Sequence, residues 1–145
     1  MNYAIILGVI SLLILLHELG HLIAAKRSGI PVERFSVGFG RKLWGFRRGE
    51  TEYWLAVIPF GGYVLPKIAN EKAWDRVPLG KRLLFAVGGP LANVIGALVC
   101  MSVVSIATAG LSFEAAVLIP LKQTWQAAVQ ICGVIPMLFG NPGEL

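Results

Sequence analysis

The sequence predicts an α-helical polytopic membrane protein with a small membrane-associated antiparallel β element between its first two transmembrane helices. Its 145 residues are 56% hydrophobic and only 14% charged, and a mean hydropathy of +0.71 lies far from that of a soluble domain. Residues 3–25 and 83–110 form two apolar runs, each longer than the roughly 20 helical residues that cross a hydrocarbon core. Aromatic and β-branched residues between these runs favour short strands.

The first apolar run, residues 3–25, contains ionisable side chains only at His17, Glu18 and His21. A signal peptide is a weak alternative, because Met1-Asn2 carries no positive charge and the apolar stretch is too long. A charged side chain deep in a bilayer costs about 2.5 kcal/mol or more, so such residues usually face a cavity and carry function. The three residues are therefore candidates for a functional site.

Residues His17-Glu18-Leu19-Gly20-His21 match the HExxH pattern of zinc hydrolases. Imidazoles at positions i and i+4 lie on one face of a helix, where both can bind one Zn²⁺, and Glu18 between them can reach a metal-bound water. In a soluble helix the same pattern often occurs by chance as solvated polar positions. This apolar helix offers no solvated face, so the pattern favours a zinc site that activates water for hydrolysis.

The connection between the two apolar runs, residues 26–82, is strongly basic. It contains 12 of the 13 Lys and Arg residues, the exception being Lys122. The positive-inside rule places this connection on the cytoplasmic side and the N-terminus outside, and its cations could also contact anionic lipid head groups. Nucleic-acid binding is the rival interpretation of this charge, and it is disfavoured because the basic residues are tethered between two spans.

Within the connection, Gly29 and Pro31 are expected to stop the first helix. Residues 34–39 and 51–58 are predicted strands, residues 40–49 a turn-rich segment, and residues 59–64 an apolar loop or edge. Aromatic side chains among basic residues indicate that this sheet rests on the membrane interface or dips into it. The alternative is a compact cytoplasmic hairpin with no role in substrate handling.

The second apolar run, residues 83–110, has no charged side chain and is expected to cross the membrane antiparallel to the first. Its sequence Gly88-Gly89-Pro90 permits close backbone approach and frees a carbonyl group. Asn93 lies at a depth similar to that of the two histidines, so its amide could bond near the metal or to a bound peptide. The alternative is that Asn93 and the glycines only hold helices together.

Residues 111–145 form a tail in which residues 125–139 are predicted to be a helix at the outer interface or against the bundle, with a third crossing as the less favoured alternative. Cys100 and Cys132 are expected to be buried small hydrophobic residues without a disulfide. Residues 1–145 are thus expected to be a single membrane-embedded core.

The chain also resembles the site-2 protease family of intramembrane zinc metalloproteases, and especially its bacterial branch. The resemblance rests on residues 17–21, 34–40 and 51–64, on Gly89-Pro90-Leu91-Ala92-Asn93, and on residues 123–125, which occur in family order. It implies Zn²⁺ bound by His17 and His21, Glu18 as general base, Asn93 near bound substrate, and a sheet edge that pairs with an extended peptide. It also implies an integral protein of the bacterial inner (plasma) membrane that cleaves transmembrane segments, such as those of anti-sigma factors or remnant signal peptides.

Two departures from the family pattern bear on the prediction. No Leu-Asp-Gly motif, which supplies the family's third zinc ligand, occurs here, and the one aspartate, Asp75, is expected to be a solvated loop residue. The 14 residues between Gly110 and Trp125 leave no room for a PDZ domain. We therefore expect a truncated intramembrane zinc endopeptidase core. The alternative is a non-catalytic membrane module that binds transmembrane segments or partner subunits, and a transporter is disfavoured because two spans with one charged cluster offer no path.

Overall fold

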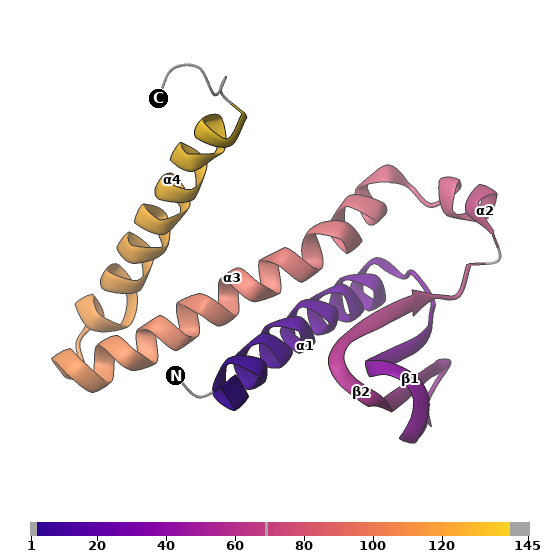
Figure 1. Cartoon of the computed structure of the whole chain (residues 1–145). Helices are drawn as coiled ribbons and strands as arrows, with labels where there is room; N and C mark the ends of the chain where they lie inside the picture. The colour runs from indigo at the N-terminus through magenta and orange to yellow at the C-terminus, as the bar shows by residue number, and fades with distance from the viewer. Residues whose placement is uncertain (1–2, 69, 140–145) are drawn as a thin grey trace. The chain divides into compact units, whose positions relative to one another are not determined.

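The computed structural model describes residues 3–68 and 70–139, which are mostly helical (Figure 1). Along the chain follow helix α1 (Tyr3–Ser28), strands β1 (Val32–Arg48) and β2 (Thr51–Pro66), the short helix α2 (Glu71–Asp75), helix α3 (Leu79–Ala109), the π-helical turn η1 (Glu114–Leu118) and helix α4 (Ile119–Phe139). The chain divides into two compact units, residues 1–94 and 95–145. Each unit is described by itself.

Helix α1 extends three residues beyond the predicted end at residue 25, through the basic residues Lys26 and Arg27. The Ser28 hydroxyl donates to the Ala24 carbonyl at 2.6 Å and so occupies an acceptor in the last turn. Gly29 then takes a left-handed conformation, with φ of +72°, and Pro31 follows. This is a common way for a helix to end, and it confirms the predicted stop at Gly29 and Pro31.

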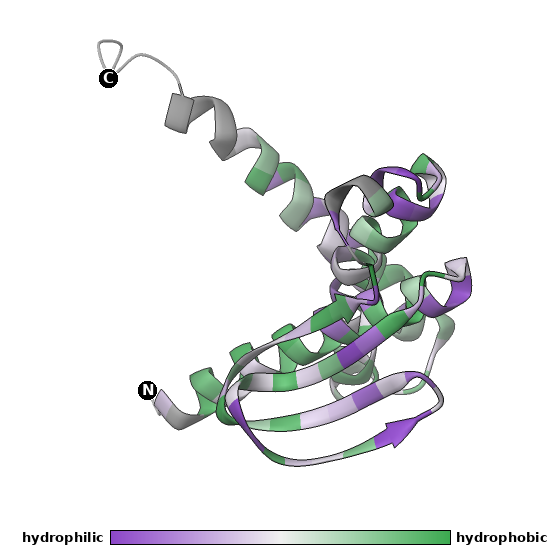
Figure 2. Cartoon of the chain, turned by 90° about the vertical axis from the view of Figure 1, so that its right-hand side faces the viewer, coloured by the Kyte–Doolittle hydropathy of each residue, from purple (hydrophilic) through white to green (hydrophobic). Residues whose placement is uncertain are grey.

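Strands β1 and β2 form an antiparallel hairpin in which Arg48 lies opposite Thr51. Both strands are long and curled, so residues 34–37 of β1 are paired on both sides, with residues 52–55 and with residues 62–65 of β2. Figure 2 shows this curl, with hydrophilic and hydrophobic residues mixed along the strands and hydrophobic residues prevailing in α1. The predicted antiparallel element between the first two long helices is therefore present.

The predicted turn within the β element was wrong, because residues 40–48 continue β1. Of the loop or edge predicted at residues 59–64, the edge is present: these residues continue β2, and residues 62–65 pair with β1 on one side of it. Gly38, Gly40 and Gly61 bend the strands without ending them, with φ of +91°, +85° and +137°. Such angles suit glycine and produce bulges in a continuing strand.

The core of the first unit lies where α1 meets the hairpin. Its buried members come from the C-terminal half of α1, the link that follows it and the start of β1, and they are Leu22, Ala25, Ile30, Val32 and Phe35. On the hairpin, the Arg34 guanidinium stacks 3.6 Å above the Trp54 ring and donates to the Tyr63 hydroxyl, a bond that raises the pKa of Arg34. The Arg34 contacts hold the hairpin together, and the buried core holds the hairpin against the half of α1 that carries the two histidines.

Helix α3 begins four residues before the predicted start at residue 83 and ends at Ala109, before Gly110 with φ of +84°. Pro90 lies inside the helix. Proline has no N–H, so the Ala86 carbonyl loses its helical partner.

The short helix α2 was not predicted from the sequence. The Asn70 side chain caps it by accepting from the Ala73 N–H.

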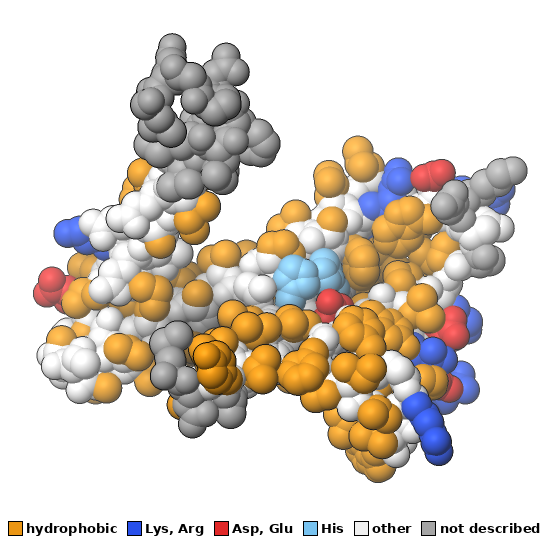
Figure 3. Space-filling model, viewed as in Figure 1, with side chains coloured by type: hydrophobic (Ala, Val, Ile, Leu, Met, Phe, Trp, Pro, Cys, Tyr) orange, Lys and Arg blue, Asp and Glu red, His pale blue; other side chains and the backbone are white. Residues whose placement is uncertain are grey.

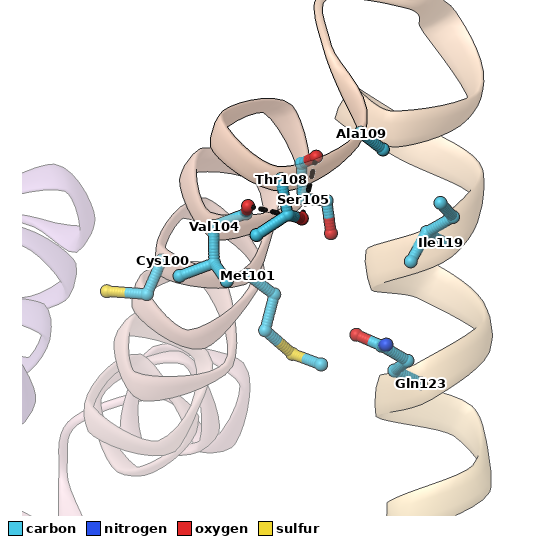
Figure 4. Close-up of a pocket in the computed structure, with 8 residues that line it drawn as sticks. All are labelled: Cys100, Met101, Val104, Ser105, Thr108, Ala109, Ile119 and Gln123. Atoms are coloured by element: carbon cyan, nitrogen blue, oxygen red, sulfur yellow. Dashed lines mark hydrogen bonds between the residues drawn. The ribbon is translucent and has the colours of Figure 1, made fainter.

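The second unit comprises the C-terminal part of α3, η1 and α4. The Ser102 hydroxyl contacts the Ala116 carbonyl at 2.8 Å. A cavity of about 310 Å³ lies between α3 and α4 (Figure 4), lined by Cys100, Met101, Val104, Ser105, Thr108, Ala109, Ile119 and Gln123. The expectation that both cysteines are buried was wrong, since Cys100 and Cys132 are exposed. The predicted tail helix is present and starts earlier, at Ile119. Residues 140–145 lie outside the described residues.

Among the described residues, two helices are long and apolar enough to cross a membrane, namely Ile5–Ser28 and Leu79–Ala109, each with a mean hydropathy of 2.1. Only 11% and 6% of their most apolar windows are buried inside the protein. Core helices of soluble proteins are mostly buried, and these two are not.

Candidate metal centre

Helix α1 places the two imidazoles side by side, as the i, i+4 spacing predicts. The Nε2 atoms of His17 and His21 are 3.1 Å apart, and the ring centroids are 4.7 Å apart in an edge-to-face arrangement. Both rings are half-buried. Figure 3 shows them (pale blue) on one face of the molecule among hydrophobic side chains.

The distance between the two Nε2 atoms suits a shared cation. Two nitrogen lone pairs at 3.1 Å repel each other unless a proton or a metal ion lies between them. Zinc–nitrogen bonds of about 2.0–2.1 Å at a tetrahedral angle place the two nitrogens about 3.3 Å apart. The two imidazoles therefore fit Zn²⁺ as a pair of ligands with little movement.

The other nitrogen of His21 is held by the backbone of α3. Its Nδ1 lies 2.7 Å from the Phe85 carbonyl oxygen, and because a carbonyl only accepts, Nδ1 must carry the proton. In a neutral ring this leaves the Nε2 lone pair free for a metal. A histidine ligand that donates its second N–H to a backbone carbonyl is a usual feature of metal sites.

The other nitrogen of His17 meets the Asn93 side chain, with Nδ1 and Nδ2 3.3 Å apart. In this orientation the Asn93 Oδ1 atom is buried and has no hydrogen-bond partner among the described residues. When Nε2 binds a metal, Nδ1 carries a proton. If the amide is rotated by 180°, which exchanges its oxygen and nitrogen in the same space, Oδ1 accepts a hydrogen bond from Nδ1–H. The unpartnered oxygen thus fits the metal-bound form of His17.

Glu18 lies on α1 between the two histidines and against the hairpin. A side-chain carbon added at Gly62 of β2 would be 3.2 Å from the Glu18 Cγ atom, so the strand backbone passes directly beside this residue. Glu18 itself is half-buried. The hairpin therefore packs against Glu18 on α1, next in sequence to His17.

Sequence reasoning identified four of the residues that the structure brings together: His17, Glu18, His21 and Asn93. It missed the Phe85 carbonyl, because a backbone acceptor leaves no trace in residue type. It also missed the contact between Glu18 and Gly62, for which residues 59–64 would have had to be recognised as a strand.

The described residues contain no group of three or more His, Cys, Asp and Glu side chains that could hold a metal. Asp75 lies at the end of α2, where it forms an ion pair with Arg82 at 3.2 Å and its side chain is 74% exposed. This confirms that Asp75 is a solvated residue, although it ends a short helix and not a loop. The structure thus brings two nitrogen ligands together, whereas catalytic zinc usually has three protein ligands.

Comparison with known proteins agrees with the resemblance seen in the sequence. Residues 4–144 match the sequence model of peptidase family M50. The regulator of sigma-E protease of Escherichia coli K12 is 42% identical over 111 residues, which are 67% of this chain and 23% of that protein. A protein of Clostridium perfringens named as a candidate zinc metalloprotease is 44% identical over 94 residues, or 61% of this chain and 28% of that protein. The chain thus spans only about a quarter of the length of these relatives.

Proposed function

Because the chain belongs to peptidase family M50, we propose that it is the zinc-binding, membrane-embedded core of a site-2-type endopeptidase. Its substrates are transmembrane segments of membrane proteins, cleaved by metal-activated water. The observation that carries the proposal is the pair of Nε2 atoms 3.1 Å apart, with Nδ1 of His21 bonded to the Phe85 carbonyl and Nδ1 of His17 beside Asn93.

The membrane location is supported by the exposed apolar surface of α1 and α3. Both helices have the length and hydropathy to span a bilayer, and less than an eighth of either apolar window is buried in the protein. Apolar surface of this extent needs lipid or a partner to cover it. With the basic connection 26–82 on the cytoplasmic side, the two histidines lie within the membrane close to its cytoplasmic edge.

The zinc assignment is supported by the geometry of the imidazoles and by relatives that are named as candidate zinc metalloproteases. Bound zinc lowers the pKa of a water molecule and polarises a carbonyl group. His17 and His21 would hold it through Nε2, and the Phe85 carbonyl and Asn93 would keep both rings in the required tautomer. A third protein ligand must come from outside the residues that the structure describes.

Glu18 is the general base and acid of the proposed reaction. Its carboxylate takes a proton from the attacking water and passes it to the leaving amine of the cleaved peptide bond. The backbone of β2 at Gly62 passes beside Glu18, which follows the metal ligand His17 in the chain. The curled hairpin also offers a strand edge on which an unwound transmembrane segment could lie extended.

The experiment that tests this function replaces Glu18 by Gln in the natural full-length protein. We expect E18Q to lose cleavage of a membrane-inserted single-span substrate and to keep its zinc, because only the proton carrier changes. E114Q is the matched control and should cleave as the unmodified protein does. Cleavage retained in E18Q would refute the role of Glu18.

A second function, a non-catalytic module that binds transmembrane segments, is favoured by one observation: the described residues contain no third zinc ligand near His17 and His21. The two functions differ in the zinc content of the purified full-length protein. Protein that is folded, free of zinc and inactive, and that retains a bound transmembrane peptide, would favour the binding module.

A further inference from the structure

Two adjacent glycines of α3 face different parts of α1. A side-chain carbon added at Gly88 would lie 2.6 Å from the Ala24 Cβ atom and 2.8 Å from the Gly20 carbonyl oxygen. One added at Gly89 would collide with His21 Nε2 and would lie 2.6 Å from His17 Nε2. Gly88 therefore meets the α1 backbone, whereas Gly89 meets the two nitrogens that would bind the metal.

The contact at Gly88 is reciprocal. A side-chain carbon at Gly20 would collide with the Gly88 carbonyl oxygen and lie 2.6 Å from the Ala92 Cβ atom. The helices thus meet through Gly20 and Ala24 on α1 and through Gly88 and Ala92 on α3, a small-xxx-small pair on each side. Such pairs let helix backbones approach closely in membranes.

This close approach has a direct consequence for the metal site. It brings the Phe85 carbonyl to His21 and the Asn93 amide to His17, one turn to either side of Gly89. It also leaves the α3 backbone at Gly89 against both Nε2 atoms, where Gly89 is buried. A glycine in a helix interior is unfavourable by itself, so two in succession indicate that the space is needed.

We propose that Gly89 is a positioning residue whose missing side chain provides the space for the metal between the imidazoles, while Gly88 and Gly20 set the distance between the helices. The inference rests on the proposed function and deepens it, since it assigns one wall of the metal site to the backbone of α3. A methyl group at position 89 would occupy the space beside Nε2 and force the rings away from the Phe85 carbonyl and from Asn93. A methyl group at position 88 would separate the helices.

The test compares G89A, G88A and G80A of the natural full-length protein in detergent, the same protein in which the proposed function is tested. Gly80 lies in the first turn of α3, where an added side-chain carbon has no neighbour within 4 Å, so G80A controls for the change in helix propensity. Two quantities are measured: the affinity for Co²⁺ and Zn²⁺, with the visible spectrum of bound Co²⁺, and the unfolding temperature of the metal-free protein.

We expect G89A to lose more than about 100-fold in metal affinity, beyond the 10–100-fold range of residues that only orient ligands. Its metal-free unfolding temperature should fall much less than that of G88A, because imidazole tips can turn away. G88A should unfold at a markedly lower temperature without metal, because the groups it meets belong to the α1 backbone and to Ala24.

Two outcomes would overturn the inference and leave the proposed function standing. In one, the unmodified chain and G89A bind Co²⁺ with equal affinity and the same spectrum. In the other, G89A and G88A destabilise the metal-free protein equally, which would mean that position 89 only packs helices. Failure of the unmodified chain to bind either metal would instead contradict the proposed function, and the comparison of metal-free stabilities would still test the two glycine contacts.

Discussion

Replacing Asn93 by Ala is expected to weaken zinc binding through His17, although Asn93 is not itself a metal ligand. When Nε2 binds the metal, Nδ1 carries a proton. The Asn93 amide, whose nitrogen lies 3.3 Å from Nδ1, supplies the acceptor through Oδ1 once the amide is rotated by 180°. A half-buried donor left without a partner costs about 1–3 kcal/mol. At about 1.4 kcal/mol per factor of ten, the zinc dissociation constant should rise about 5- to 140-fold, which overlaps the 10–100-fold effects of residues that orient metal ligands.

The assay is a competitive zinc titration against a chromophoric chelator, with the protein in detergent. N70A is the matched control, because Asn70 caps α2 through the Ala73 N–H and is exposed. N93D separates the two orientations of the amide: a carboxylate can accept from Nδ1–H, so N93D should bind zinc at least as tightly as the unmodified chain. Unchanged affinity in N93A, or a loss in N93D as large as in N93A, would refute the reasoning.

Three further predictions follow from the same contacts. G61A should lower the unfolding temperature more than G49A. Both glycines have positive φ, +137° and +62°, but only at Gly61 would an added carbon collide with the Phe39 ring. Equal effects of the two substitutions would contradict this packing of the hairpin. Removal of zinc by a chelator should lower the unfolding temperature of the purified protein, because binding to the folded state alone stabilises it, and the shift should vanish in a variant with Ala at both His17 and His21. G20A should destabilise the protein far more than G8A in thermal unfolding, because a carbon at Gly20 meets the Gly88 backbone and one at Gly8 has no neighbour within 4 Å.

The sequence was sufficient to predict the two long helices, the β element between them and the pairing of His17 with His21. These depend on local patterns, namely apolar run length and i, i+4 spacing. Residues 40–48 were predicted wrongly as a turn, because glycine indicates a turn and a bent strand equally well. Only the pairing across the hairpin, such as Lys42 with Ala56, distinguishes the two.

The rest of the candidate site could not be predicted, because it depends on how α1 and α3 cross. Gly88 and Gly89 were recognised as residues that permit close approach. Adjacent residues of a helix point about 100° apart. The rotation of α3 about its own axis therefore decides which glycine meets the α1 backbone and which meets the imidazoles. Hydropathy does not fix that rotation, since α3 is apolar on all sides.

The bond from His21 to the main chain at position 85 affects how variants of this chain should be interpreted. Every amino acid supplies a backbone oxygen, so the Phe85 side chain can be exchanged while the acceptor stays in place. A mutational scan would then score position 85 as tolerant and overlook its part in holding the ring. Only a change in the path of the helix, for example at Pro90, or a backbone ester introduced chemically, would reveal how much the site owes to that oxygen.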